Sequence, residues 1–295
     1  MLQPVYLPDL RMIPHERSDI APHAARPAPP LATEAINSRT LPLSGPNPLA
    51  RRRVILSPHP DDAVWSLGGA MAAWRELGEV LVVSVFDGDG LEASHDGASG
   101  ERWRGDRMTA IRRREDREAL ESLGCALAGL GLPDAALRQD PTGAFACLTV
   151  EELFAEQPLR RWPRVSGELV ARVQALLRPD DVVVAPLAVG RHVDHCIVHK
   201  LARHLDCDVD YYAEFPYASA PDAPEVASHL ATLGLWTRPH AIPCQWAPWL
   251  HAASRYRSQV LRLFGGGAAF AQRLGVYAGA NEGRPCSRIW SMRLR

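Results

Sequence analysis

The feature that most constrains this fold is a short apolar segment leading directly into polar residues. Residues 53–57 have the length and character of a buried strand, and His59, Asp61 and Asp62 follow at once. Residues 61–77 then repeat apolar side chains at a three-to-four spacing, which indicates an amphipathic helix. Open α/β sheets bind ligands at such strand-to-helix corners. A nucleotide-binding sheet would place glycines here, whereas this chain has metal-ligand and acid–base residue types.

Further apolar runs predict the rest of the sheet. Residues 79–86 and 181–186 are continuous apolar runs, typical of parallel strands buried on both faces. Thr149 and Glu152 stand at the spacing of a capping box. Further helices are expected at 108–123, 148–157, 165–177 and 246–264, a short apolar run at 126–132, and further strands at 209–214 and 289–294. The predicted fold class is α/β, a Rossmann-like and mostly parallel sheet flanked by helices.

The first 50 residues differ in composition from the rest. Ten of the 25 prolines precede residue 49, and proline cannot donate to helix or sheet ladders. We therefore predict that residues 1–50 are a proline-rich N-terminal arm, extended or disordered, and that residues 51–295 are a single domain. Whether the arm wraps this domain or a partner subunit is left open.

Composition excludes several classes of protein. Lys and Arg number 33 against 34 Asp and Glu, so no net field attracts nucleic acid or an anionic membrane. No run approaches the roughly 18 apolar residues of a membrane span, and the N-terminus lacks the pattern of a secretory signal. Six cysteines without a CxxC pair argue against a disulfide scaffold. A soluble, cytoplasmic protein with reduced thiols is expected, and its oligomeric state is open.

A second corner carries the same chemistry as the first. After the strand at 181–186, His192, Asp194 and His195 lead into another helix. Both corners of a parallel sheet lie at one edge, so the two clusters can converge. A catalytic zinc takes three protein ligands and leaves its fourth position to water. Two histidines and one aspartate would fill that shell, leaving a carboxylate and a histidine for acid–base work on an amide.

Each corner alone has a simpler explanation. The helix dipole favours carboxylates such as Asp61 and Asp62 in a first turn by ~0.3–1 kcal/mol, and Asp194 has the same setting. The combination of two corners with complementary donors favours the catalytic interpretation. His199, one turn beyond His195, is expected to be a helix-face residue.

Several motifs resemble the PIG-L/LmbE-like family of zinc-dependent N-acetylglucosaminyl-type deacetylases. The ending His59-Pro60-Asp61-Asp62 is similar to the family hallmark, and residues 181–195 fit its second histidine segment position by position. Similar stretches occur at 112–124, 130–134, 212–217 and 256–259, so that the resemblance covers about residues 53–259.

The resemblance implies a role for each site residue. It implies three zinc ligands, His59, Asp62 and His195. It implies Asp61 as the general base and His192 as the acid and oxyanion-stabilising partner, with Asp194 tuning His192. The expected metal is Zn²⁺, although Fe²⁺ also suits two histidines and a carboxylate.

Substrate contacts are expected from three further residues. Arg112 and Asp134 correspond to positions that bind sugar hydroxyls, which need both donors and acceptors; for Arg112 a surface salt bridge is the alternative. Trp103 lies in the long polar loop at 87–105, which we expect to act as a lid.

Three positions depart from the family pattern. Ala63 replaces a glutamate and Ala135 replaces a glycine, and neither change touches an implied ligand. Gly190 stands where some members place a tyrosine that polarises the substrate carbonyl. Carbonyl polarisation is therefore expected to fall to zinc and His192 alone.

The expected function is hydrolysis of an N-acyl group, above all acetyl, from an N-acylated amino sugar or an amino-sugar-bearing small molecule such as an antibiotic glycoside. A thiol-conjugate amidase on the same scaffold is the nearest alternative. A non-catalytic metal- or sugar-binding module is another, and the presence of both Asp61 and His192 argues against it.

Overall fold

The computed structural model describes residues 51–89, 104–139, 143–145, 147, 149–154, 165–218, 224–233, 239–279, 283 and 285–291. The expected arm at 1–50, Trp103 and most of the expected lid lie outside these residues. The elements are, in chain order, β1 (Arg53–Ser57), α1 (Asp62–Leu77), β2 (Val80–Ser84), α2 (Arg104–Ser122), β3 (Ala126–Gly129), η2 (Glu151–Phe154), α4 (Gly167–Gln174), β4 (Val182–Pro186), α5 (Val193–Ala202), β5 (Asp208–Tyr212), α6 (Pro224–Thr232), β6 (His240–Pro243), α7 (Trp246–Ala253), α8 (Arg257–Phe264), α9 (Gly267–Ala278) and β7 (Cys286–Ser291).

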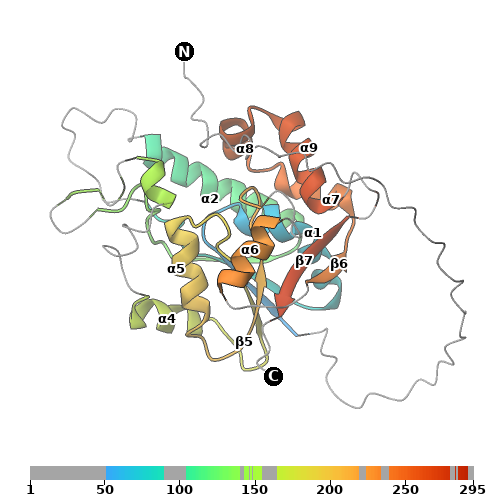
Figure 1. Cartoon of the computed structure of the whole chain (residues 1–295), viewed down its shortest axis with the longest axis horizontal. Helices are drawn as coiled ribbons and strands as arrows, with labels where there is room; N and C mark the ends of the chain where they lie inside the picture. The colour runs from blue at the N-terminus through green and yellow to red at the C-terminus, as the bar shows by residue number, and fades with distance from the viewer. Residues whose placement is uncertain are drawn as a thin grey trace, which may run out of the picture.

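A seven-stranded sheet organises the molecule. Its strand order is β3-β2-β1-β4-β5-β7-β6, in which β1 to β5 run parallel and β7 runs antiparallel to both neighbours. Helices α4 and α5 lie together on one side of the view in Figure 1, opposite α2, α8 and α9. Because the sheet is covered, the apolar residues of central strand β1 are fully buried. The predicted fold class is confirmed.

The neighbouring parallel strands β1 and β4 end at the same edge of the sheet. Ile55 of β1 pairs with Val184 of β4, so the segments after Ser57 and after Pro186 emerge side by side. The order reverses between these strands, because β1 continues through α1 to β2 on one side while β4 continues through α5 to β5 on the other. Such a switch point is where a doubly wound sheet opens a crevice at its carboxyl edge.

Some elements differ from expectation. The helix expected at 246–264 is two helices, α7 and α8, because Tyr256 turns inward at the break and donates its hydroxyl to Asp116 at 2.6 Å. Helices α6 and α9 and the edge strand β6 were not predicted. The capping box is confirmed, since Thr149 and Glu152 exchange hydrogen bonds at 3.4 Å.

Helix α1 packs closely against residues 244–253, which include helix α7. A Cβ on Gly68 would lie 2.8 Å from Trp249 Nε1, and one on Gly69 would lie 2.7 Å from Cys244 Cβ. Trp249 Nε1 donates to the carbonyl of Val64 at 2.8 Å, and Trp65 Nε1 donates to the Ala253 carbonyl at 3.0 Å. The two small residues therefore let α7 approach the backbone of α1 directly.

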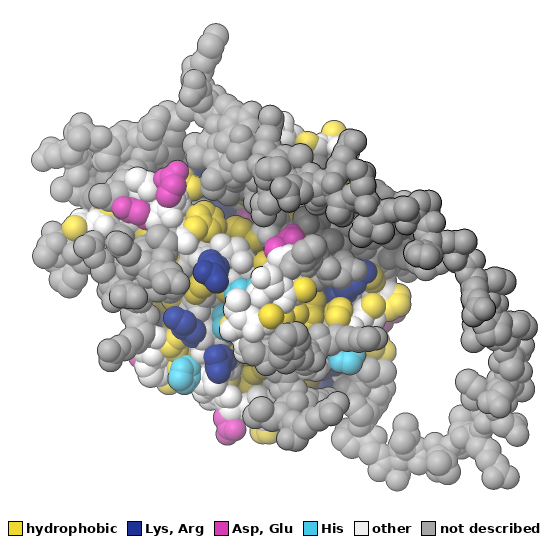
Figure 2. Space-filling view, in the orientation of Figure 1, with side chains coloured by type: hydrophobic (Ala, Val, Ile, Leu, Met, Phe, Trp, Pro, Cys, Tyr) yellow, Lys and Arg dark blue, Asp and Glu magenta, His cyan; other side chains and the backbone are white. Residues whose placement is uncertain are grey.

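Charge is mixed on the surface. On the face shown in Figure 2, basic, acidic and apolar side chains of the described residues are interspersed. Within the described ranges, no helix combines the length and apolar character needed to cross a membrane.

Candidate metal centre and active site

The first corner, between β1 and α1, is held by its own residues. Ser57 Oγ donates to the carbonyl of His59 at 2.6 Å and accepts from the Ala63 N–H at 3.1 Å. Asp62 Oδ2 accepts from the His59 N–H at 2.9 Å. Asp61 has a φ of 116°, which non-glycine residues rarely adopt, and its side chain makes no capping bond to the helix. The Asp61 carboxylate is thus turned away from the usual capping role, at a local cost of order 1–3 kcal/mol.

The second corner, between β4 and α5, is held by a residue from another strand. Glu214, just beyond β5, accepts from the N–H groups of Ala188 at 2.8 Å and Val189 at 3.3 Å. Its Oε1 also lies 3.0 Å from His195 Nδ1. Ala188 and Arg191 have φ values of 63° and 57°. The fully buried Glu214 therefore fixes both the shape of this loop and the orientation of the His195 ring.

The structure brings the three expected metal donors together. Asp62 Oδ2 lies 3.3 Å from His59 Nδ1 and 3.2 Å from His195 Nε2. Among the described residues, His195 Nε2 is buried and has no hydrogen-bond partner. His195 Nε2 and Asp62 form an ion pair while the ring is protonated, and a neutral ring would leave the same two atoms to bind a metal ion. The two nitrogens and one oxygen suit Zn²⁺, and Fe²⁺ as well.

Both histidines are oriented by a second carboxylate. His59 Nε2 lies 3.1 Å from Asp194 Oδ2, which leaves His59 Nδ1 toward Asp62. Glu214 does the same for His195. Carboxylates of this kind fix the tautomer and raise the basicity of metal-binding histidines. Asp194, which the resemblance assigns to tuning His192, also accepts from the Ala135 N–H at 2.9 Å and pairs with Arg138.

Two other donor groups share part of this centre. The ligand atoms of His59, His192 and His195 lie within 4.8 Å of one another, as do those of His59, Asp134 and Asp194. Both groups contain His59, and neither contains Asp62. Asp62 Oδ2 nevertheless lies within 3.3 Å of a ring nitrogen of both His59 and His195, which favours an ion held on the Asp62 side.

Carboxylates dominate the electrostatics of the centre. Burial alone would lower the pKa of His59, but Asp134, Asp194 and Asp62 outweigh it and raise the pKa to about 10. Burial is likewise outweighed at His195, where Asp62 and Glu214 raise the pKa to about 9. The buried site is therefore strongly negative and attracts positive charge, which a divalent cation would supply.

Asp61 stands beside the donors with a different environment. Burial raises the pKa of Asp61 to about 7, against the lowering effect of the Arg112 guanidinium. Arg112 Nη2 lies 3.3 Å from Asp61 Oδ2 and donates to the Pro60 carbonyl at 3.2 Å, and its Nη1 lies 3.6 Å from Asp134 Oδ2. Arg112 thus points into the site rather than forming a surface salt bridge. A carboxylate with a pKa near 7 is suited to accept a proton from water.

His192 lies opposite, at the start of α5. Its Nδ1 accepts from the Asp194 N–H at 3.3 Å, so the ring proton of the neutral form is on Nε2. Burial and the neighbouring His59 lower the pKa of His192 to about 3, although Asp194 acts in the opposite direction. The expected charge attraction by Asp194 is thus present but outweighed. His192 is a neutral donor through Nε2.

Sequence reasoning assigned no role to Glu214 or Arg138. Glu214 lies two residues beyond β5, whose first three residues are not buried, and the strand expected at 209–214 included it, so the pattern of the two corners did not single it out. Arg138 has no such signal, because its role comes from folding the segment after Asp134 back onto Asp194. Trp103 lies outside the described residues.

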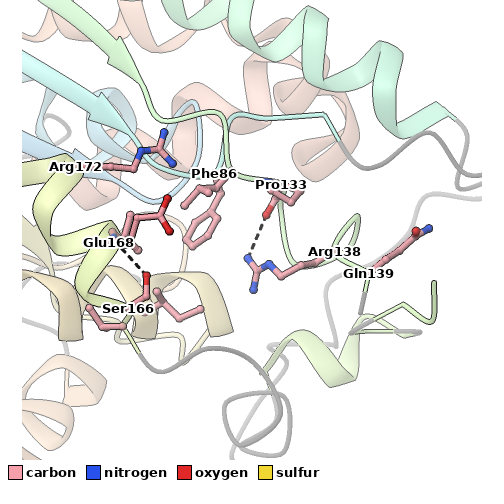
Figure 3. A pocket seen from close by; sticks show the side chains of 11 residues that line it. Phe86, Pro133, Arg138, Gln139, Ser166, Glu168 and Arg172 are labelled. Atoms are coloured by element: carbon pink, nitrogen blue, oxygen red, sulfur yellow. Dashed lines mark hydrogen bonds between the residues drawn. The ribbon is translucent and has the colours of Figure 1, made fainter. Parts of the chain in front are cut away.

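Arg138 also borders a cavity next to the centre. The cavity has a volume of about 310 Å³ and is lined mainly by apolar side chains, with Arg172, Glu168 and Arg138 at its edge (Figure 3). The Arg138 guanidinium lies 4.8 Å from the Phe86 ring, and Phe86 lies 6.2 Å from the His59 ring. Phe86 and Arg138 therefore form the wall between this cavity and the metal donors.

Comparison with known families agrees with this geometry. The sequence model of the family "PIG-L: GlcNAc-PI de-N-acetylase" matches residues 54–205, which include both corners. The chain belongs to the PIG-L family.

Two curated relatives are similar over part of their length. The chain is 32% identical over 189 residues to the 2'-N-acetylparomamine deacetylase of Streptomyces fradiae, covering 59% of this chain and 61% of that protein. It is 27% identical over 180 residues to the mycothiol S-conjugate amidase of Streptomyces coelicolor, covering 57% of each. The chain therefore spans about three fifths of the length of the curated relatives it matches.

Solved structures share the fold. The zinc-inhibited form of teicoplanin deacetylase Orf2 has a TM-score of 0.64 at 24% identity, covering 81% of this chain and 97% of that one. A deacetylase–teicoplanin complex has a TM-score of 0.61 at 22% identity, with the same coverage.

Proposed function

We propose that this PIG-L family protein is a metal-dependent hydrolase that removes an N-acetyl group from an amino sugar or an amino-sugar-bearing small molecule. The observation that carries the proposal is the approach of Asp62 Oδ2 to both His59 Nδ1 and His195 Nε2, at 3.3 and 3.2 Å, with Asp61 in the adjacent position of the chain. The similarity to a 2'-N-acetylparomamine deacetylase supports the substrate class. We infer Zn²⁺ as the metal, with Fe²⁺ as the alternative.

His59, Asp62 and His195 would hold the ion, which when bound would acidify a water molecule and polarise the amide carbonyl. Asp61 Oδ accepts a proton from the water as the water oxygen bonds to the acyl carbon. His192 Nε2 donates a hydrogen bond to the oxygen that becomes negative. When the carbon–nitrogen bond breaks, the leaving amine takes up the proton that Asp61 accepted. His192 can share this last role only while its ring is charged, which its low pKa disfavours.

The sugar is bound through groups at the open side of Asp61. Arg112 supplies donors and Asp134 supplies acceptors, and both side chains are about one-fifth exposed. Hydroxyl groups need both kinds of partner, so this pair suits a neutral sugar. Because Arg112 contacts Asp61 directly, sugar binding would also position the carboxylate that receives the proton.

The test combines metal analysis with a substrate panel. Purified protein is incubated with Zn²⁺ and with N-acetylglucosamine and 2'-N-acetylparomamine, and acetate release and substrate mass are measured. We expect Asp61→Asn to lower kcat/KM by roughly 10²–10⁴-fold while zinc content stays unchanged. Asp180→Asn, at an exposed surface position, is the matched control. An Asp61→Asn variant as active as the parent, in a protein that binds no metal, would exclude the proposal.

A thiol-conjugate amidase is the second candidate, favoured by the similarity to mycothiol S-conjugate amidase. The same donors would serve that reaction, since it also hydrolyses an amide. Adding a mycothiol S-conjugate to the panel separates the two. A kcat/KM higher for the conjugate than for both N-acetyl sugars would assign the protein to the amidase.

A further inference from the structure

Tyr217 occupies the space where a side chain at position 190 would project. It follows β5 by a short segment and packs its ring base on Gly190. A Cβ added to Gly190 would lie 2.7 Å from Tyr217 Cβ and 2.5 Å from Tyr217 Cγ. Gly190 does not have a left-handed φ, so its lack of a side chain serves to admit this ring. The second corner therefore receives an aromatic side chain from a neighbouring segment.

The ring of Tyr217 lies beside both imidazoles of the corner. Its centroid is 5.0 Å from that of His195, edge to face at 81°, and 6.4 Å from that of His192. Phe154 of η2 lies 5.9 Å from the Tyr217 ring and 5.3 Å from the His192 ring. With its base on Gly190, the ring extends past these groups, so its hydroxyl end is directed away from the loop.

The hydroxyl of Tyr217, a partly exposed residue, differs from those of three buried tyrosines. Tyr212 donates to the Leu56 carbonyl at 3.1 Å, Tyr256 to Asp116 at 2.6 Å, and Tyr277 to the Ala213 carbonyl at 2.6 Å. The Tyr217 hydroxyl is not hydrogen-bonded to another group in the described part of the chain, and it is not among the buried polar atoms left without a partner there, so it is open to a ligand. A tyrosine whose ring is fixed by packing and whose hydroxyl has no protein acceptor can donate a hydrogen bond to a ligand.

We propose that the Tyr217 hydroxyl donates a hydrogen bond to the carbonyl oxygen of the substrate acyl group. This rests on the proposed amide hydrolysis and adds a residue to it. Tyr217 and His192 Nε2 then form a pair of donors for the oxygen that becomes negative in the transition state, where such donors act most strongly. Carbonyl polarisation is accordingly not left to the metal and His192 alone.

The first test separates catalysis from structure. Tyr217→Phe keeps the ring on Gly190 and removes only the donor. We expect kcat on an N-acetyl amino sugar to fall about 100-fold with KM within about threefold, since the bond strengthens in the transition state. Tyr277→Phe, which removes a fully buried hydroxyl bonded to the Ala213 carbonyl, is the control and should leave kcat unchanged. Equal kcat values for Tyr217→Phe and Tyr277→Phe would overturn the assignment.

A second variant tests the position of the ring. Gly190→Ala would push the Tyr217 ring aside, because the nearest atoms to the added methyl group all belong to Tyr217. It should lower kcat on its own and have little further effect in the Tyr217→Phe background. If the losses of kcat from the two substitutions were additive in the double variant, Gly190→Ala would not act through the Tyr217 hydroxyl.

A binding measurement makes the inference independent of the reaction. Acetohydroxamic acid presents a carbonyl oxygen and needs no turnover. Its dissociation constant for zinc-loaded protein, by calorimetry, should rise about tenfold in Tyr217→Phe and stay unchanged in Tyr277→Phe. If no amino sugar or thiol conjugate is cleaved but this difference holds, the proposed function fails and the Tyr217 assignment stands. Equal affinity in all three proteins refutes Tyr217 as the donor.

Discussion

The two corners of the site hold their candidate metal donors by different means. At the first, Ser57, His59 and Asp62 bond to one another within six residues, and Asp61 carries the local backbone strain. At the second, the loop after β4 makes its decisive bonds to Glu214, beyond the next strand. One half of the site is therefore encoded locally, whereas the other half depends on the pairing of β4 with β5. Substitutions in the two halves should therefore differ in their effects on stability and on zinc affinity.

The largest effect is expected from Glu214→Gln. An amide cannot accept from both the loop N–H groups and His195 Nδ1 without presenting a donor to one of them. We expect zinc affinity to fall about 10–100-fold and the free energy of unfolding of the metal-free protein to fall by about 3 kcal/mol. A zinc competition titration and urea unfolding measure the two losses.

Glu121→Gln, at an exposed position of α2, is the matched control for that substitution. If Glu214→Gln lost stability but kept its zinc affinity, the second corner would be held by its own residues after all, and the contrast between the corners would disappear.

Asp116→Asn tests a buried carboxylate outside both corners. Asp116 accepts from Ser84 Oγ at 2.8 Å and from Tyr256, and burial raises its pKa to about 6. A raised carboxyl pKa contributes stability below the unfolded-state value of about 4, and that stability is lost as pH rises through about 6. Relative to the Asn variant, the free energy of unfolding of the parent should therefore fall by about 3 kcal/mol between pH 4 and pH 8. Urea unfolding of both metal-free proteins across this pH range measures the difference in their free energies of unfolding. A difference that does not change with pH would contradict the prediction.

The smallest effect is expected from Ser57→Ala at the first corner. Two buried hydrogen bonds of one hydroxyl are lost, which costs about 1–2 kcal/mol of unfolding free energy. Zinc affinity should change less than about threefold, because the bond from the His59 N–H to Asp62 remains. Ser122→Ala, at an exposed helix end, is the control. A zinc loss as large as that of Glu214→Gln would show that both corners respond alike.

The locally encoded features were predictable from the sequence, and the features set by pairing were not. The runs at β1, β2 and β4 are apolar because both faces of the sheet are covered, so their patterns indicate strands directly. The two corners follow from where those runs end. Glu214 acquires its partners only through the register that sets Pro186 beside Tyr212, which no single segment contains.

Other differences have the same origin in distant contacts. Asp194 turns to His59 and Arg138 rather than to His192, its neighbour in sequence. The break between α7 and α8 serves the bond from Tyr256 to Asp116, 140 residues earlier. Strand β6 is largely exposed at the sheet edge, so it has no apolar pattern to reveal it.

Because α7 packs directly on α1, the segment that contains the two corners is not expected to fold by itself. The segment from β1 to α5 contains the three candidate metal donors. A fragment ending there would expose Trp65 and the glycine face of α1 to water, since Trp249, Ala253 and Phe270 all come later. During synthesis, His59 and His195 would likewise emerge from the ribosome before the residues that cover α1. Attempts to transplant or minimise this site have to take the last quarter of the chain along.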